Sequence, residues 1–362
     1  MVYYPSQGGN FMKTKICNIK VEYFSEPIGL NAKFPHYSWE FLCDADNVLI
    51  GNMTITGNKL YGFGDIFADF KMGENNPVYA DGFYTPDVNG TLGQWTTDMG
   101  EATTDAELII FALPSPLVRT VAKDLSEYVS KGQIIVNLSK GLEKGSLKRL
   151  SEVLSEEIPQ GRIVVMSGPS HAEEVSRDIP TTVVVSSEDI HIAEIVQDIF
   201  MSPKFRVYTN PDVVGVELGG ALKNIIAFGA GICDGLGYGD NAKAALMTRG
   251  IKEIGRLGVA MGAKASTFSG LSGIGDLIVT CTSMHSRNRR AGILIGEGKT
   301  MDEAMTAVNQ VVEGVYSAKA AILLAEKYNV SMPIVKDVSG ALSGLSPHIL
   351  YHGCPIILPS KS

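Results

Sequence analysis

The residues best suited to chemistry are a lysine, an aspartate and a group of arginines in the second half of the chain. Lys223 lies in a glycine-rich stretch, residues 215–224, that predicts a closely packed helix. Asp276 ends the sequence Gly-Ile-Gly-Asp, and residues 286–290 read Ser-Arg-Asn-Arg-Arg. Together they could bind a phosphate and act on a carbonyl group. The alternative is a lysine that merely extends from a packed helix into solvent.

Lys223 would be the proton donor if a ketone were reduced by hydride transfer. The ordinary pKa of lysine is ~10.4, so acid–base work near neutral pH requires burial or nearby cations that lower this pKa. We expect Lys140 and Arg287 to supply positive charge, and Asp276 to orient the ammonium and balance its charge.

The arginine group at residues 286–290 is expected at the start of a helix. Unpaired backbone N–H groups and bidentate guanidinium donors suit a phosphate there. A solvated basic turn is the alternative. Neither His171 nor His285 has a partner at metal-ligand spacing, so the sequence predicts no metal site.

A second candidate is the sequence Ser-Gly-Pro-Ser-His-Ala at residues 167–172. It follows a predicted strand and opens a predicted helix with two glutamates in its first turn. Ligands bind at the carboxyl ends of parallel strands in α/β folds, which favours a ligand-binding turn. A capped turn without a ligand is the alternative.

These motifs closely resemble the bacterial type of the glycerol-3-phosphate dehydrogenase family. The resemblance also rests on residues 208–210 and 241–249, and it is dense over residues 96–336. It implies that Lys223 is the catalytic residue. The substrate-binding residues that it implies are Lys140, Gly168, Ser170, Asn224, Asp276, Thr280, Ser286, Arg287 and Asn288. It also implies NAD or NADP as the cofactor, bound by Pro114, Ser115, Lys140, Ala172, Arg287, Val311 and Glu313.

The resemblance implies reversible conversion of dihydroxyacetone phosphate to sn-glycerol 3-phosphate with NAD(P)H, a step toward glycerophospholipids. The family's opening Gly-x-Gly-x-x-Gly turn is not recognisable in the first 95 residues. The nearest sequence, at residues 62–67, has phenylalanine in the third glycine position. The alternative is an impaired or inactive remnant or fusion that lacks the cofactor half and acts as a phosphate-binding or interaction module.

Four short apolar runs, at residues 108–113, 133–138, 162–166 and 181–186, predict strands covered on both faces, as in a parallel sheet. Helices are predicted between them from the spacing of two sets of residues, which are Leu117, Val121, Leu125 and Tyr128, and then Leu147, Leu150 and Leu154. Residues 96–210 are therefore interpreted as an α/β domain, the second half of a Rossmann-like sheet.

Residues 211–336 predict an all-helical substrate domain, with helices at 213–235, 242–260 and 313–328. The glycines at residues 235–239 predict a turn between two helices. Residues 1–95 predict an atypical β-rich segment with strands at 21–24, 37–41 and 53–56, and residues 337–362 predict an irregular tail.

Composition limits the range of functions. The chain has 362 residues and a net charge of −8, which disfavours nucleic acid and anionic membranes as partners. Its five cysteines are widely spaced, which favours a reducing, cytoplasmic location, and no uncharged apolar run predicts a membrane span. The expected partner is a small phosphorylated substrate. The sequence does not decide whether the protein forms a homodimer.

Overall fold

The structure is a computed structural model. It describes residues 3–5, 16–20, 40–43, 49–50, 53–54, 59–61, 79–80, 83–84, 94–96, 99–103, 106–175, 179–308 and 312–342. The chain divides into two compact units. The first, called the α/β unit, comprises Met1–Ser139, Leu150–Met166 and Ser170–Pro211, and the second, called the helical unit, comprises Lys140–Arg149, Ser167–Pro169 and Asp212–Ser362.

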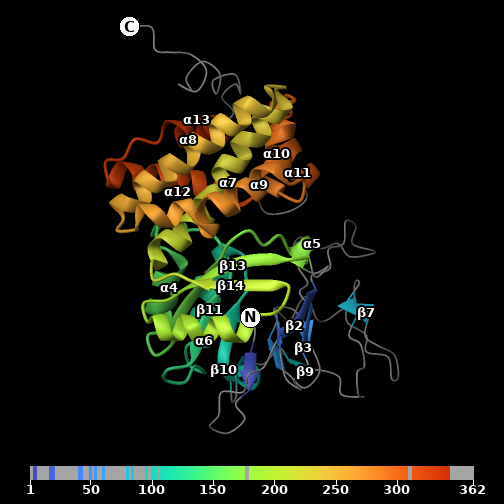
Figure 1. Cartoon of the computed structure of the whole chain (residues 1–362), viewed down its shortest axis with the longest axis vertical. Coiled ribbons are helices and arrows are strands. Elements are labelled where there is room, and N and C mark those ends of the chain that lie inside the picture. The colour runs from blue at the N-terminus through green and yellow to red at the C-terminus, as the bar shows by residue number, and fades with distance from the viewer. Residues whose placement is uncertain are drawn as a thin grey trace. The chain divides into compact units, whose positions relative to one another are not determined.

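A six-stranded sheet forms the centre of the α/β unit (Figure 1). Strands β10, β11 and β12 are parallel, as are β13 and β14, whereas β1 pairs antiparallel with β10 at one edge. In sheet order the strands are β1 (Tyr3–Pro5), β10 (Ala106–Phe111), β11 (Ile134–Asn137), β12 (Arg162–Ser167), β13 (Thr181–Ser186) and β14 (Phe205–Thr209).

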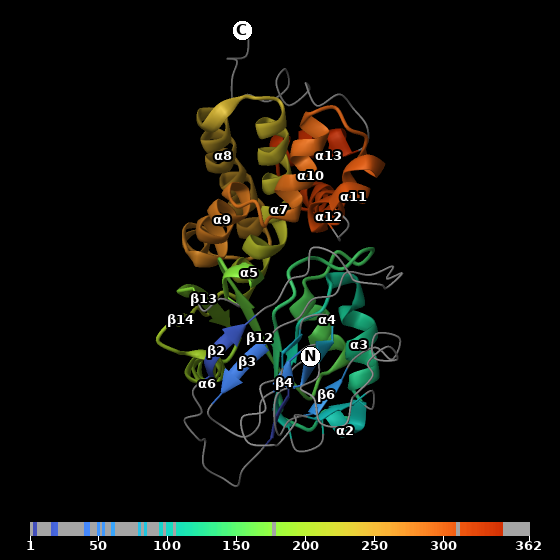
Figure 2. The ribbon, with the colours of Figure 1, turned by 90° about the vertical axis from the view of Figure 1, so that its right-hand side faces the viewer.

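Alternate side chains of these strands enter two separate cores. On one face, Leu108 and Ile110 pack with α6 (Ile190–Phe200), and on the other, Ile109 and Phe111 pack with α3 (Val118–Leu125) and α4 (Leu150–Glu157). Figure 2 shows helices on both sides of the strands. Because both faces are covered, β11 and the last four residues of β10 are buried, and the predicted parallel α/β sheet is confirmed.

Leu147 departs from the predicted helical spacing. It lies before α4 with a φ of 61°, so only Leu150 and Leu154 of the predicted set belong to that helix. The short helices η1 (Ser115–Leu117) and α5 (Ala172–Val175) follow β10 and β12.

The described parts of residues 1–95 are short strands. The paired strands are β2 (Ile16–Lys20) with β3 (Glu40–Cys43), β4 (Leu49–Ile50) with β5 (Met53–Thr54), β6 (Lys59–Tyr61) with β9 (Gln94–Thr96), and β7 (Tyr79–Ala80) with β8 (Phe83–Tyr84). Helix α2 (Met99–Thr103) follows. The strand predicted at residues 21–24, most of the one at 37–41, and residues 62–67 lie outside the described residues.

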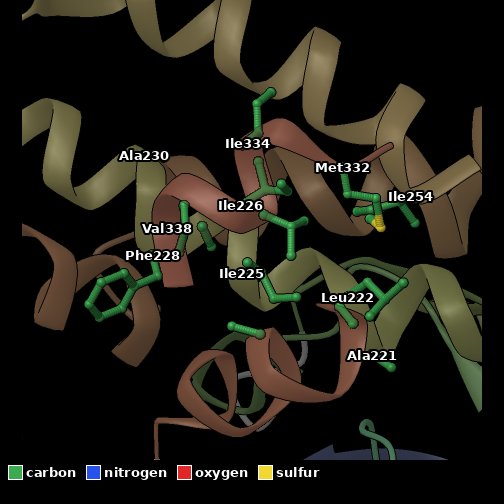
Figure 3. Packing of buried hydrophobic residues seen from close by; sticks show 14 of the residues in the cluster. Ala221, Leu222, Ile225, Ile226, Phe228, Ala230, Ile254, Met332, Ile334 and Val338 are labelled. Carbon is green, nitrogen blue, oxygen red and sulfur yellow. The ribbon is translucent and has the colours of Figure 1, made fainter. Parts of the chain in front are cut away.

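Helix α7 (Val213–Gly235) is the core of the helical unit. Its bounds are those predicted, and the other elements pack around it (Figures 1 and 3). They are α8 (Gly239–Ala260), η2 (Ala265–Ser269), η3 (Leu271–Gly275), α9 (Asp276–Thr282), α10 (Arg287–Gly296), α11 (Met301–Val308), α12 (Glu313–Lys327) and α13 (Pro333–Leu342). By length and composition, α7 is the one described helix that could cross a membrane, but it is mostly buried inside this unit, as core helices are.

The end of the helical unit differs from the sequence prediction. An irregular tail was expected from residue 337, but α13 continues to Leu342. Val338 and Ala341 are buried in the helical core, where Val338 lies beside Phe228 and Ile226 (Figure 3), and their burial favours the helix. Residues 343–362 lie outside the described residues.

Candidate active site

Lys223 and Asp276 meet where α7 packs against the start of α9. Helix α7 approaches η3 closely at Gly219, because a methyl group on this residue would clash with the Ser272 carbonyl oxygen. The π-helical turn of η3 then leads directly into Asp276, the first residue of α9. The glycines that suggested a closely packed helix thus let two backbones meet beside the lysine.

Asp276 is a buried carboxylate shared by two lysines. One of its oxygens accepts a short hydrogen bond from Lys223 Nζ, and the other accepts from Lys140 Nζ at 2.8 Å. Lys140 Nζ also donates to the Gly168 carbonyl oxygen at 2.8 Å. The structure therefore brings together four residues that the sequence predicted for one site, and all four belong to the helical unit.

Thr280 completes this network one turn further along α9. Its hydroxyl donates to the Asp276 carbonyl oxygen at 2.6 Å and accepts from Lys223 Nζ at 2.8 Å. Among the described residues, Asp276 and Thr280 thus engage two of the three N–H donors of the lysine. A third donor remains to reach a substrate oxygen.

Electrostatics set the protonation of this network. Burial lowers the pKa of Lys223 from 10.5 to about 8, with Lys140 reinforcing and Asp276 opposing the effect. Burial also opposes ionisation of Asp276, but Lys140 and Lys223 outweigh it and hold the pKa of this carboxyl below its ordinary value. Burial raises the pKa of the neighbouring Cys281 thiol to about 12, so it adds no negative charge. With both lysines protonated the network carries one net positive charge, which suits a developing oxyanion.

The segment that carries Lys140 is fastened to α7. Residues 142 and 149 pair as an isolated antiparallel bridge, and Arg149 Nη1 donates to the buried carboxylate of Glu217 at 2.7 Å. The aliphatic stem of Lys140 lies over Gly220, where a methyl group would meet it at an ordinary 3.5 Å but would clash with the Ser167 hydroxyl oxygen. The sequence analysis did not anticipate this ion pair, because no local pattern relates two residues so far apart in the chain.

The predicted phosphate-binding residues lie at the start of α10, as expected. Ser286 is the N-cap, and its hydroxyl accepts from the Arg289 backbone N–H at 3.2 Å. Arg287 is the first helical residue, and the buried Asn288 accepts from the Gly314 backbone N–H at 2.8 Å. This bond holds the first turn of α12, which begins at Glu313, against the Asn288 side chain.

Arg289 does not join this group as the three-arginine pattern suggested. Its side chain turns to the end of α7, where Nε donates to Asp234 at 2.8 Å, and the same carboxylate accepts from Lys243 at 2.8 Å. Sequence reasoning missed this network. The spacing of the arginines indicates a basic turn but not the direction of each side chain.

The remaining predicted residues are distributed over both units. Asn224 is buried on α7 beside Lys223, and Pro114 and Ser115 form the start of η1 after β10. Ser170 and Ala172 follow β12, where Ala172 opens α5. Val311 lies outside the described residues. Pro114, Ser115, Ser170 and Ala172 thus lie at the carboxyl ends of two parallel strands, the expected edge for a ligand.

Comparisons with known proteins identify the family that this chain resembles. Residues 65–193 match the family model described as NAD-dependent glycerol-3-phosphate dehydrogenase N-terminus, and residues 212–348 match the corresponding C-terminus. The matches extend beyond residues 96–336 in both directions.

The relatives and one solved structure carry the same name. A glycerol-3-phosphate dehydrogenase [NAD(P)+] of Fusobacterium nucleatum is 57% identical over 249 residues, covering 68% of this chain and 74% of the relative. One from Clostridium perfringens is 53% identical over 287 residues, covering 79% and 86%. The crystal structure of glycerol-3-phosphate dehydrogenase from Coxiella burnetii has a TM-score of 0.70 and 37% identity, covering 75% of this chain and 82% of that one.

Proposed function

The chain belongs to the NAD-dependent glycerol-3-phosphate dehydrogenase family, and from this premise we propose that it reduces dihydroxyacetone phosphate reversibly to sn-glycerol 3-phosphate. The observation that carries the proposal is the buried network of Lys223, Asp276 and Lys140, with the pKa of Lys223 lowered to about 8. A lysine tuned in this way can give a proton to a ketone oxygen or remove one from an alcohol.

Each residue then has a distinct part. Lys223 directs its remaining N–H at the substrate carbonyl oxygen and transfers the proton, while Asp276 and Thr280 hold the ammonium in place. Lys140 adds positive charge beside the same oxygen. Asn224, Gly168 and Ser170 contact the carbon chain of the substrate, and Ser286, Arg287 and Asn288 bind its phosphate.

The turns after β10 and β12 suit a dinucleotide, because Ser115, Ser170 and Ala172 are small residues at the ligand-binding edge of a parallel sheet. Pro114, Ser115, Ala172, Lys140, Arg287, Val311 and Glu313 are the residues proposed to hold it. When bound, the nicotinamide supplies the hydride. The alternative of a non-catalytic remnant is disfavoured, since both the N-terminal and the C-terminal family models match this chain.

We further propose that the product supplies the backbone of glycerophospholipids and that the enzyme works in the cytoplasm. The wide spacing of the five cysteines, with no Cys-x-x-Cys pair, supports the proposed location.

The decisive experiment follows oxidation of NADH and NADPH at the nicotinamide absorbance, with dihydroxyacetone phosphate and the purified chain. Enzyme-like consumption of either cofactor supports the proposal, and consumption of neither overturns it.

Lys223→Met, which keeps the aliphatic stem, should reduce kcat by roughly 10²–10⁴-fold, the usual contribution of a general acid. Circular dichroism should show that this variant remains folded. Retained turnover would remove Lys223 from the mechanism.

A further inference from the structure

Arg289 occupies an unusual place beside the proposed phosphate site. Its side chain is 13% exposed, and its guanidinium donates to Asp234, to the Thr282 carbonyl oxygen and, at 3.2 Å, to Met284 Sδ. Nε donates to an Asp234 carboxylate oxygen at 2.8 Å, and Nη1 donates to the Thr282 carbonyl oxygen at 2.6 Å. Thr282 is the last residue of α9, so the side chain of Arg289 holds the end of the helix that carries Asp276 and Thr280.

The backbone of Arg289 holds the other end of the same loop. Residues 283–286 connect α9 to α10, and the Arg289 backbone N–H donates to the Ser286 hydroxyl at 3.2 Å. One residue therefore fixes the point where the loop leaves α9 and the point where it enters α10. Arg287, the proposed phosphate ligand, follows immediately after this loop.

The charge of Arg289 is partly compensated by Asp234. Asp234 is 16% exposed and accepts from both Arg289 and Lys243, so two cations share this carboxylate. A guanidinium engaged by a carboxylate and a carbonyl has few donors left for a phosphate. Its contacts suit a role in holding the loop rather than in binding the ligand.

We propose that Arg289, anchored by Asp234, is a positioning residue that holds Ser286 and Arg287 in the geometry that binds the substrate phosphate. The inference rests on the proposed function, since it assigns the phosphate to those two residues. Without the anchor, the side chain of residue 289 no longer ties the end of α9 to the start of α10.

The test compares wild type with Arg289→Gln and Asp234→Asn. KM for dihydroxyacetone phosphate should rise by roughly 10- to 100-fold, the effect expected when a binding group is displaced by about 1 Å. KM for NADH, and kcat/KM for dihydroxyacetone, which lacks the phosphate, should stay within about twofold. Arg289→Lys, which retains the charge, should recover part of the loss. In the double variant, KM for dihydroxyacetone phosphate should be no higher than in the more impaired single variant, because both substitutions break the same contact between Arg289 and Asp234.

Arg256→Gln is the matched control, since Arg256 also donates to a backbone carbonyl, that of Ser331, elsewhere in the helical unit. It should leave KM unchanged. An equal loss of kcat/KM with dihydroxyacetone, or no loss with either substrate, would overturn the positioning role.

Calorimetric titration with glycerol 3-phosphate separates the positioning role from the proposed dehydrogenase activity. Wild type that binds this ligand without turnover refutes the dehydrogenase activity alone, whereas equal binding by wild type and Arg289→Gln refutes the positioning role alone.

Discussion

At the scale of single residues, the site depends on a carboxylate that serves two ammonium groups. Asp276 is 1% exposed, so its charge is tolerated only because Lys140 and Lys223 both donate to it. The same carboxylate opposes the lowering of the Lys223 pKa by burial. Asp276 therefore helps to set the pH at which Lys223 can act, besides orienting it.

The rate of reduction should fall as pH rises through about 8, because the proton donor is the charged form of Lys223. Oxidation of glycerol 3-phosphate needs the neutral amine, so its rate should rise through the same pH. Measuring kcat/KM against pH for reduction and for oxidation checks both the predicted fall and the predicted rise. A reduction rate that stays constant from pH 7 to pH 10 would contradict this assignment.

Asp276→Asn should move the descending limb of the reduction profile to lower pH. The substitution removes the negative charge that favours the ammonium and leaves Lys140 repelling it, so the pKa of Lys223 falls. The rate should also drop, since the ammonium loses its orientation. Thr280→Val is a useful comparison, because it removes the hydroxyl that accepts from Lys223 without changing any charge. This variant should have a lower kcat, but its reduction rate should fall at the same pH as that of wild type.

At the scale of elements, α7 and α10 pack with their backbones in close approach. A methyl group on Gly231 would clash with the Arg289 carbonyl oxygen, and one on Gly292 would clash with the Phe228 carbonyl oxygen. This contact holds the first turn of α10, and with it the proposed phosphate ligands, against the helix that carries Lys223. Gly231 and Gly292 therefore help to position the proposed phosphate ligands as well as to pack the core.

Gly231→Ala should lower the free energy of unfolding by about 1–3 kcal/mol, because the two helices must separate to admit the methyl group. Gly255→Ala in α8 is the control, since its methyl group would meet the Phe268 ring at 3.7 Å, an ordinary contact. That control should be neutral or stabilising by about 0.5–1 kcal/mol. Urea denaturation measures both. Equal stability of the two variants would show that α10 can move away at little cost.

The accuracy of the sequence predictions follows from what each pattern encodes. The bounds of α7 and four strands of the sheet, β10, β11, β12 and β13, were predicted because long apolar runs indicate burial directly. The prediction that Leu147 belongs to a helix was wrong, because its spacing fits a helix whereas its backbone is left-handed. Strand β14 was not predicted, since Arg206 and Tyr208 are exposed and interrupt the apolar run.

Within the site, sequence could identify the residues but not their pairing. That Lys140 reaches the carboxylate of Asp276 depends on a contact across more than a hundred positions of the chain. The direction of Arg289 depends likewise on Asp234, at the far end of α7. Residue types predict the chemistry, and packing between distant segments decides which groups perform it.

At the scale of the whole molecule, the proposed cofactor residues belong to both units. Pro114, Ser115 and Ala172 lie in the α/β unit, whereas Lys140, Arg287 and Glu313 lie in the helical unit. Each unit alone therefore contains only part of the proposed set.

NADH or NADPH should raise the thermal unfolding temperature of the full chain. A ligand that binds only the folded state stabilises it by about 2.7 kcal/mol at a concentration 100 times its Kd. Differential scanning fluorimetry with each dinucleotide, and with adenosine as a control lacking the phosphates and nicotinamide, checks this. Absence of a shift at millimolar concentrations of both dinucleotides would favour the remnant alternative.

The burial of α7 also has a consequence during synthesis. This apolar helix leaves the ribosome before α8–α13, the helices that cover it, have been made. At typical elongation rates the remaining residues take on the order of ten seconds, during which a segment long and apolar enough for a bilayer stays uncovered. The nascent chain thus exposes apolar surface that is prone to aggregation until the covering helices are made. Glu217 and Lys223, charged residues within that helix, disfavour its insertion into lipid before its partners arrive.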